Sequence, residues 1–234
     1  MVEYVGFISD VINRSETILK VGRDKNYDAT ALLMLMISGF ALPYERLSNW
    51  GETDPGLHPE NTLNRIKKLA KKITAESADD PLREHFSRTN LSKWRRYVLR
   101  KDGVSPKDFR REALPRIVDK SLEHDRNWSV KDLMRMMRNA LAHGGIHPLS
   151  PRQVRSCCNS DASESRVISQ VDDKIDRIFL VSRVDTKEDD PKKDIGINII
   201  DVSLPELKNF WYDWKSILLD QIGDEGVATL ARAA

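Results

Sequence analysis

The amino-acid sequence predicts a mainly α-helical protein, a helical bundle with a short β-strand insertion before its last helix. Apolar residues recur at three-and-four spacing through most of residues 1–150 and again over 204–222, which is the pattern of amphipathic helices. From about 166 to 203, runs of β-branched residues alternate partly with polar ones, which is typical of short strands. We expect the 234 residues to form a single domain of the bundle type.

The N-terminal part of the chain carries three helical patterns. Residues 3–21 predict an amphipathic helix. Residues 27–42 are apolar nearly all round, so they predict the most buried helix, and Pro43 should end or kink it because proline has no amide proton to donate. A loop rich in proline and glycine follows at 48–59, and a basic helix with outward lysines follows at 60–75.

The middle and the end of the chain alternate between the two kinds of pattern. Helical spacing at 91–100 and 106–124 predicts two further helical pieces. After Pro151 the pattern changes, and β-branched runs predict two or three short strands within 166–171, 176–184 and 196–203.

The helix predicted over 129–143 has the clearest boundaries. Ser129 followed three residues later by Asp132 resembles a capping box, in which two side chains hydrogen-bond the first turn of a helix. Gly144 and Gly145 form a strong C-terminal stop, because glycine readily adopts the left-handed conformation that ends many helices.

Three polar residues, Arg138, Asn139 and His143, stand together near the end of this helix. Asn139 and His143 are four residues apart and share a helix face, and the long Arg138 side chain can reach the same region. The unpaired carbonyls of the last helical turn favour a positive charge at His143. An arginine can clamp phosphate oxygens, a histidine can move a proton, and an asparagine can orient either group, so the cluster suits phosphodiester chemistry.

The segment RNALAHG resembles the signature of HEPN domains, in which an Arg and a polar residue are followed a few positions later by His. In this sequence these are Arg138, Asn139 and His143. The resemblance implies a metal-independent endoribonuclease that cuts RNA by attack of the ribose 2′-hydroxyl on the adjacent phosphate. It also implies a symmetric homodimer with facing motifs, a role as a toxin or phage-defence effector, and an antitoxin protein as a further partner.

Two other interpretations fit the same residues. The first is a catalytically silent HEPN-like module that binds RNA, a nucleotide or a protein partner. The second is a structural dimer without a ligand, in which Arg138 is a surface residue and His143 only caps the helix. Met136 lies off the apolar stripe of this helix, so we expect it near a partner chain.

Charge is distributed unevenly along the chain. Residues 61–120 contain 17 Lys or Arg against 8 Asp or Glu, an excess of nine positive charges in a chain whose net charge is +2. A basic stretch of this kind is either an RNA-binding surface or an ordinary solvated helix face. The residues that would contact RNA are Lys67, Lys68, Lys71, Lys72, Arg95, Arg96 and Arg100.

The sequence predicts neither a metal site nor a cofactor. The histidines lack ligand-like spacing with carboxylates or cysteines, and the adjacent Cys157 and Cys158 do not have the spacing of zinc ligands. No apolar run reaches the roughly 18–20 residues that cross a bilayer. The N-terminus carries an acidic residue where a signal peptide carries basic ones, so we expect a cytoplasmic protein.

Overall fold

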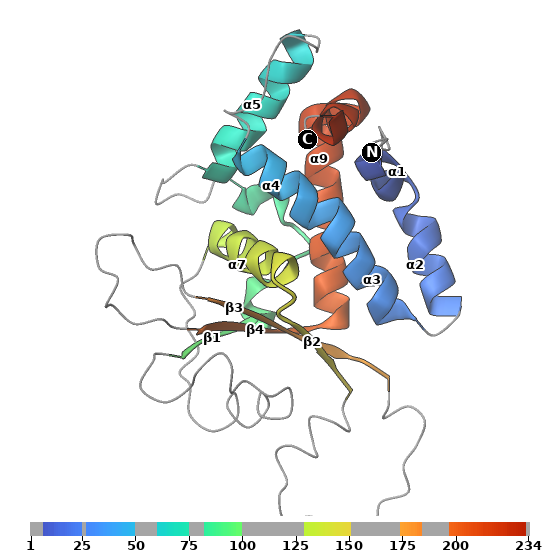
Figure 1. Ribbon diagram of the computed structural model, residues 1–234, viewed down its shortest axis with the longest axis vertical. Coiled ribbons are helices and arrows are strands. Elements are labelled where there is room, and N and C mark those ends of the chain that lie inside the picture. The colour runs from blue at the N-terminus through green and yellow to red at the C-terminus, as the bar shows by residue number, and fades with distance from the viewer. Residues whose placement is uncertain are drawn as a thin grey trace, which may run out of the picture. The chain divides into compact units, whose positions relative to one another are not determined.

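The computed structural model describes most of the predicted elements (Figure 1). The residues described are 7–24, 27–49, 60–74, 82–99, 129–150, 174–183 and 197–232. They form a mainly α-helical protein with a small antiparallel sheet, which confirms the predicted fold class. The predicted helix at 106–124 and the predicted strand at 166–171 lie outside them.

The chain divides into two compact units, each built from separate stretches of sequence. The first unit takes the chain up to Asn90, Ser129–Met134 and everything from Lys208 onward. The second takes the chain between Leu91 and Leu207, without Ser129–Met134. Helices α7, Val130–Ala142, and α9, Leu204–Arg232, each contribute to both units. The expectation of a single domain stays a prediction.

The first unit begins with two helices where the sequence predicted one over 3–21. These are α1, Phe7–Asn13, and α2, Ser15–Asp24. The completely buried Ser15 hydroxyl donates a hydrogen bond to the carbonyl of Ile12 at 2.7 Å. A serine that bonds the backbone of the preceding turn competes with the helical ladder, and this accounts for the break at Arg14.

The helix predicted over 27–42 continues through Pro43. It consists of α3, Asp28–Leu35, a π-helical segment, Met36–Ala41, and α4, Leu42–Ser48. One side is deeply buried, as expected, but the other is not, since Met34 is 58% and Leu42 is 42% exposed. The proline is accommodated because it stands at the start of α4, directly after the wider π-helical turn.

The π-helical segment packs on α9 through Gly39. In a regular α-helix the carbonyl of Gly39 would accept a hydrogen bond from residue 43, which is proline and has no N–H. The indole N–H of Trp214 donates to this carbonyl instead, at 2.8 Å and in a buried position. A β-carbon at Gly39 would overlap the ring of Trp211, so only glycine permits this approach of helix to helix.

Aromatic packing surrounds the same contact. The ring of Phe40 meets Phe210 and Trp214 edge-on, with centroids 5.1 and 5.3 Å apart. Such edge-to-face pairs add to the stability that burial of the rings supplies. The fully buried aromatic residues of this unit therefore form the centre of its core.

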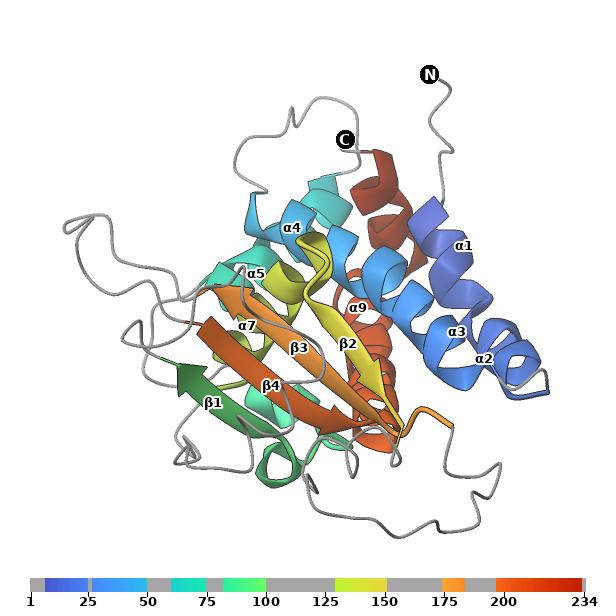
Figure 2. The same cartoon turned by 60° about the horizontal axis from the view of Figure 1, so that its bottom comes forward.

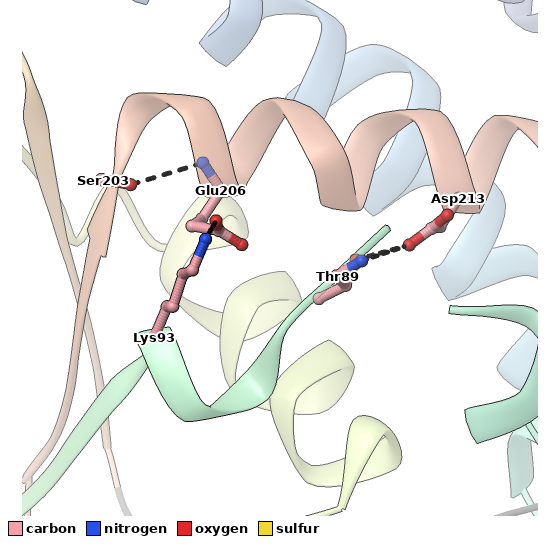
Figure 3. Close-up of polar contacts among 5 residues, drawn as sticks. All are labelled: Thr89, Lys93, Ser203, Glu206 and Asp213. Carbon is pink, nitrogen blue, oxygen red and sulfur yellow. Dashed lines mark hydrogen bonds and ion pairs between the residues drawn. The ribbon is translucent and has the colours of Figure 1, made fainter. Parts of the chain in front are cut away.

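Two further elements of the first unit behave as the sequence predicts. The basic helix is α5, Glu60–Thr74, with its apolar residues buried. Helix α9 begins at Leu204, as predicted for 204–222. Its first segment also ends where predicted, because Gly223 interrupts the helix with a φ of 69° before the helix resumes. The buried carboxylate of Asp213 on α9 accepts hydrogen bonds from the backbone N–H and the hydroxyl of Thr89, at 2.8 and 2.7 Å (Figure 3). These bonds secure the chain around Thr89.

The second unit contains the sheet, in the strand order β1-β4-β3-β2 (Figure 2). Strands β3, Arg177–Arg183, and β4, Ile197–Ser203, confirm two of the predicted strands. The edges are β1, Arg95–Leu99, and β2, Ile146–Leu149. The prediction of a helix over 91–100 is therefore wrong. The physical reason is long-range: β1 pairs with β4, about a hundred residues later in the chain, and that partner is invisible to local spacing.

Strand β4 has side chains buried on both faces, as is usual for a central strand. Its Asp201 is 1% exposed, and its carboxylate accepts two hydrogen bonds from Arg177, one of them at 2.9 Å from Nε. The paired arginine offsets the cost of burying this charge. Burial raises the pKa of the Tyr97 phenol above its ordinary value, and the charge of Asp201 raises it further. Tyr97 is therefore neutral at physiological pH.

The start of α9 is fixed within the second unit. The hydroxyl of Ser203 accepts a hydrogen bond from the backbone N–H of Glu206 at 3.4 Å, which is the N-cap half of a capping box (Figure 3). The carboxylate of Glu206, buried to 6% side-chain exposure, pairs with Lys93 at 2.9 Å. The turn between β4 and α9 is thus held by both a cap and an ion pair.

Replacing Trp214 by phenylalanine should lower the free energy of unfolding more than replacing Trp211 by phenylalanine. Trp214→Phe leaves the buried Gly39 carbonyl without its donor, which costs about 1–3 kcal/mol beyond the lost ring volume. Trp211→Phe is the matched control, since the indole N–H of Trp211 has no hydrogen-bond partner among the described residues. Urea unfolding of both variants measures the difference. Equal losses would contradict a stabilising role for the bond.

Candidate active site

The motif helix α7 begins with the predicted capping box. The Ser129 hydroxyl accepts a hydrogen bond from the backbone N–H of Asp132 at 3.0 Å. In return, the Asp132 carboxylate accepts bonds from the hydroxyl and the backbone N–H of Ser129, at 2.9 and 3.3 Å. Such a cap typically stabilises a helix by about 1 kcal/mol. The helix start predicted from the sequence is confirmed to within one residue.

The C-terminal end of α7 depends on two glycines with different tasks. Gly144 adopts a φ of 71°, the left-handed conformation, and the N–H of Gly145 bonds the carbonyl of Ala140 at 2.8 Å. This is the hydrogen-bond pattern of a Schellman cap. A β-carbon on Gly145 would overlap the carbonyl oxygen of Val181 in β3. The first glycine is required for its conformation and the second for its close approach to the sheet.

The structure brings two of the three motif side chains together. The Arg138 guanidinium donates a hydrogen bond to the side-chain oxygen of Asn139 at 2.8 Å, and both residues are half-buried. His143 is exposed, and its side chain forms no hydrogen bond or ion pair with the residues that the structure describes. Asn139 therefore orients Arg138 and not His143.

The C-terminal part of α7 thus carries the Arg138 guanidinium, which is hydrogen-bonded to Asn139, and the exposed imidazole of His143. His143 follows Arg138 by five positions, which is about 7.5 Å along the helix axis and about 140° round it. Ala142, between them in sequence, is exposed and presents only a methyl group. No bulky side chain therefore stands at residue 142, on the exposed surface beside these two residues.

The comparison with protein families identifies the family of the chain. A family model described as HEPN pEK499 p136 matches residues 1–160, which is more than half of the chain and includes the whole of α7. The chain belongs to this HEPN family. Membership indicates a nuclease or nucleotide-binding function in general. No curated protein and no solved structure matches the chain.

The lysines of this HEPN protein that were predicted to contact RNA lie on α5. Lys67, Lys68 and Lys71 are exposed and form no ion pair or hydrogen bond with the described part of the chain. Lys72 is half-buried, and its ammonium group lies 3.3 Å from Nε2 of His85 and 3.4 Å from Oε1 of Gln221. Three of the four lysines thus remain available to an anionic ligand, and their role in binding RNA stays a prediction.

The predicted arginines are distributed differently. Arg95 and Arg96 are neighbours in the edge strand β1, so their side chains point to opposite faces of the sheet. Arg96 donates to the Asn198 side chain at 3.4 Å. Arg100 lies outside the described residues. The structure does not bring Arg95 and Arg96 to one surface, and their contact with RNA also stays a prediction.

One expectation about the motif helix is wrong. Met136 was placed near a partner chain because it lies off the apolar stripe, but it is 3% exposed within this chain alone. Val130, Leu133, Met134 and Met137 are buried as well. The helix is therefore buried on most of its circumference, and its polar residues lie on the remaining face, which solvent can reach.

Metal ligands and membrane-spanning helices are the two remaining features to consider. Among the residues that the structure describes, no three His, Cys, Asp or Glu side chains lie close enough together to hold a metal ion. Within the same residues, no helix combines the length and the apolar character needed to cross a membrane.

Gly144→Ala should destabilise the HEPN protein, whereas Gly144→Asn should do so less. A β-carbon at residue 144 meets no atom within 4 Å, so the cost arises from the left-handed backbone alone, about 1–2 kcal/mol for alanine. Asparagine tolerates this conformation better and serves as the control. Urea unfolding measures both variants, and equal stability of the alanine and wild-type proteins would contradict the assigned cap.

Proposed function

We propose that this HEPN protein is a metal-independent endoribonuclease whose site consists of Arg138, Asn139 and His143. The observation that best supports the proposal is that one helix carries both an oriented guanidinium and an exposed imidazole. The Arg138 guanidinium is oriented by its 2.8 Å hydrogen bond to Asn139, and the imidazole of His143 is exposed at the end of the helix. In this proposal Arg138 clamps the scissile phosphate, Asn139 positions the arginine, and His143 is the general acid or base. The family match supports a nucleic-acid or nucleotide ligand in general.

The reaction that these groups suit is transphosphorylation. The ribose 2′-oxygen attacks the adjacent phosphorus, and the bond from phosphorus to the 5′-oxygen of the next nucleotide breaks. The products are a 2′,3′-cyclic phosphate and a 5′-hydroxyl. One proton leaves the 2′-hydroxyl and one is delivered to the departing 5′-oxygen, and positioned imidazoles are well suited to both transfers.

The guanidinium contributes electrostatic stabilisation. Negative charge builds up on the non-bridging phosphate oxygens as the new bond forms, and a guanidinium can donate two parallel hydrogen bonds to them. The bond from Arg138 to Asn139 uses one of its donors and restricts its orientation before substrate arrives. A cation that is already oriented loses less freedom when it binds the transition state.

We extend the proposal to a homodimer with the motif helices of both chains at a shared interface. A single chain supplies one His143, whereas transphosphorylation uses both a base and an acid. A two-fold axis beside the motif would supply the second imidazole, since an isologous interface repeats one patch on both partners. The HEPN resemblance also supports a role as a toxin or phage-defence effector with an antitoxin protein as partner.

The first test is the chemistry of the cut. Purified protein incubated with total RNA in EDTA should cleave it and leave 2′,3′-cyclic or derived phosphate ends, because the proposed proton transfers and charge stabilisation all use side chains. End-group analysis by enzymatic labelling and mass spectrometry measures the result. Strict dependence on Mg²⁺ or Mn²⁺ would contradict the mechanism. Binding of RNA or a nucleotide without cleavage would favour the catalytically silent module.

The second test separates the site from the fold. His143→Ala and Arg138→Ala should each reduce cleavage by roughly 10²- to 10⁴-fold, the contribution of a proton-transfer or charge-stabilising group. His143 is exposed and Arg138 half-buried, so the unfolding midpoint should stay close to that of the wild type. Rates on a fluorescent oligonucleotide and circular-dichroism melts measure the two effects.

Two controls accompany these variants: a substitution elsewhere on the same helix, and a mixture of the two variant chains. Ala142→Ser changes an exposed residue without removing a motif group, and it should retain activity. A mixed dimer of His143→Ala and Arg138→Ala chains retains one intact Arg138 and one intact His143. It should therefore stay inactive if both imidazoles are required, and recovery of activity would mean that one Arg138 and one His143 from different chains suffice. Loss of activity together with loss of folding in both variants would support a purely structural role for the motif.

A further inference from the structure

Four exposed residues form a polar patch on helix α5 that the proposed chemistry does not use. They are Asn64, Lys67, Lys68 and Lys71, and the apolar residues of the helix are buried on its other side. Lys71 follows Lys67 by four positions and Lys68 by three, so it lies about 40° and 60° round the helix from them, between the two. Asn64 lies between the same two lysines one turn earlier. These four residues are the lysine patch of α5.

The lysines of the patch have no counter-charge in the part of the chain that the structure describes. Glu60 is the one acidic residue of α5, and it precedes Lys67 by about two helical turns. Lys67, Lys68 and Lys71 form no hydrogen bond or ion pair within the described residues. Cations three or four positions apart on a helix repel one another, so the patch lowers the stability of α5. Attraction to the carbonyls of the last helical turn accounts for Lys71 at most.

The remaining lysine of the helix, Lys72, has a different environment. It is half-buried, and its ammonium group donates a hydrogen bond to Oε1 of Gln221 on α9 at 3.4 Å and lies 3.3 Å from Nε2 of His85. All three residues belong to the first unit, so Lys72 helps to anchor α5 within it. The structure thus separates one anchoring lysine from three that no contact of the described chain explains.

The side chains of the patch fit a phosphate backbone better than a protein partner. Stable protein interfaces have an apolar or aromatic centre and are depleted in lysine, whereas the patch offers ammonium groups and one amide and no apolar side chain. Lysine and asparagine are common donors to the phosphate and sugar oxygens of nucleic acids. A membrane fits less well, because amphipathic helices bind lipid through their apolar face, and that of α5 is buried in the protein.

We propose that the lysine patch of α5 binds the phosphodiester backbone of a nucleic acid without reading its sequence. Contacts to phosphate carry no sequence information, and each neutralised phosphate releases counter-ions, which makes the binding depend on salt. The assignment of the nucleic acid as RNA rests on the proposed ribonuclease function, whereas the backbone contact does not. In a ribonuclease the patch raises the affinity for long RNA and takes no part in the chemical step.

The test measures binding by the full chain to a labelled oligonucleotide of 2′-O-methylated RNA, which attack by a 2′-oxygen cannot cleave. Fluorescence anisotropy gives the affinity over a series of salt concentrations. The triple variant Lys67→Gln/Lys68→Gln/Lys71→Gln should bind about 10-fold more weakly or worse, and the slope of log K against log salt should fall in magnitude by about 2, since each phosphate contact on a single strand contributes about 0.7. Unchanged affinity and slope would overturn the proposal.

Matched variants control for charge and for folding. Lys72→Gln removes the same charge from the same helix, but it should keep the wild-type slope and lower the unfolding midpoint, because Lys72 is an anchoring residue. Lys68→Gln should do the reverse. A second triple variant, Arg14→Gln/Lys20→Gln/Arg23→Gln, removes three exposed positive charges at the start of α2 and along it, and it should bind as the wild type does. Equal losses in both triple variants would mean that binding follows net charge alone, which would overturn the patch.

Kinetics and other polyanions complete the test. If the protein cleaves RNA, the patch variant should raise KM for a long RNA by about 10-fold or more, with kcat and the cleavage of a dinucleotide unchanged, because only phosphate contacts outside the motif are lost. A fall in kcat would overturn the assigned role. If the protein cleaves nothing, the ribonuclease proposal fails and the binding measurement still decides on the patch. Tighter binding of poly-glutamate or phosphatidylserine vesicles than of the oligonucleotide, lost in the patch variant, would indicate an acidic protein or a membrane and overturn the proposal.

Discussion

The end of α7 is the constraint on which the candidate site and the sheet edge both depend. The left-handed backbone of Gly144 turns the chain, the N–H of Gly145 caps the Ala140 carbonyl, and Gly145 then packs against Val181. Because the helix ends at Ala142, His143 lies directly after it and is exposed. The same turn starts β2, which pairs with β3, so one local geometry fixes the position of the histidine relative to the sheet.

The first unit contains an analogous compensation between backbone and side chain. Proline at residue 43 removes a donor, the π-helical segment widens the turn, and the indole of Trp214 satisfies the Gly39 carbonyl that proline leaves without its regular donor. An unsatisfied buried carbonyl would cost free energy comparable to a lost hydrogen bond, so the tryptophan allows the proline to remain in the helix. The absence of a side chain at Gly39 is needed for the same reason, since Trp211 lies against it.

The polar residues of α7 divide the proposed chemistry according to their exposure. Asn139 and Arg138 are half-buried and hydrogen-bonded to each other, which holds the cation in one orientation. His143 is exposed, so a substrate can reach it. A rigid helix with a capped start and a capped end is a suitable support, because catalytic geometry tolerates little displacement of the groups involved.

Local sequence determined the elements whose stabilising partners are near in the chain. The capping box at Ser129 and the glycine stop were predicted, since hydrogen bonds within four residues and backbone preference specify them. The role of the motif residues stays a prediction. The predicted strands that became β3 and β4 follow from β-branched patterning. Tertiary structure alone decided that residues 95–99 form a strand, because their partner β4 lies a hundred residues away, and that Met136 is buried. It also decided that Asn139 orients Arg138, because spacing shows which side chains can meet, whereas packing selects which of them do.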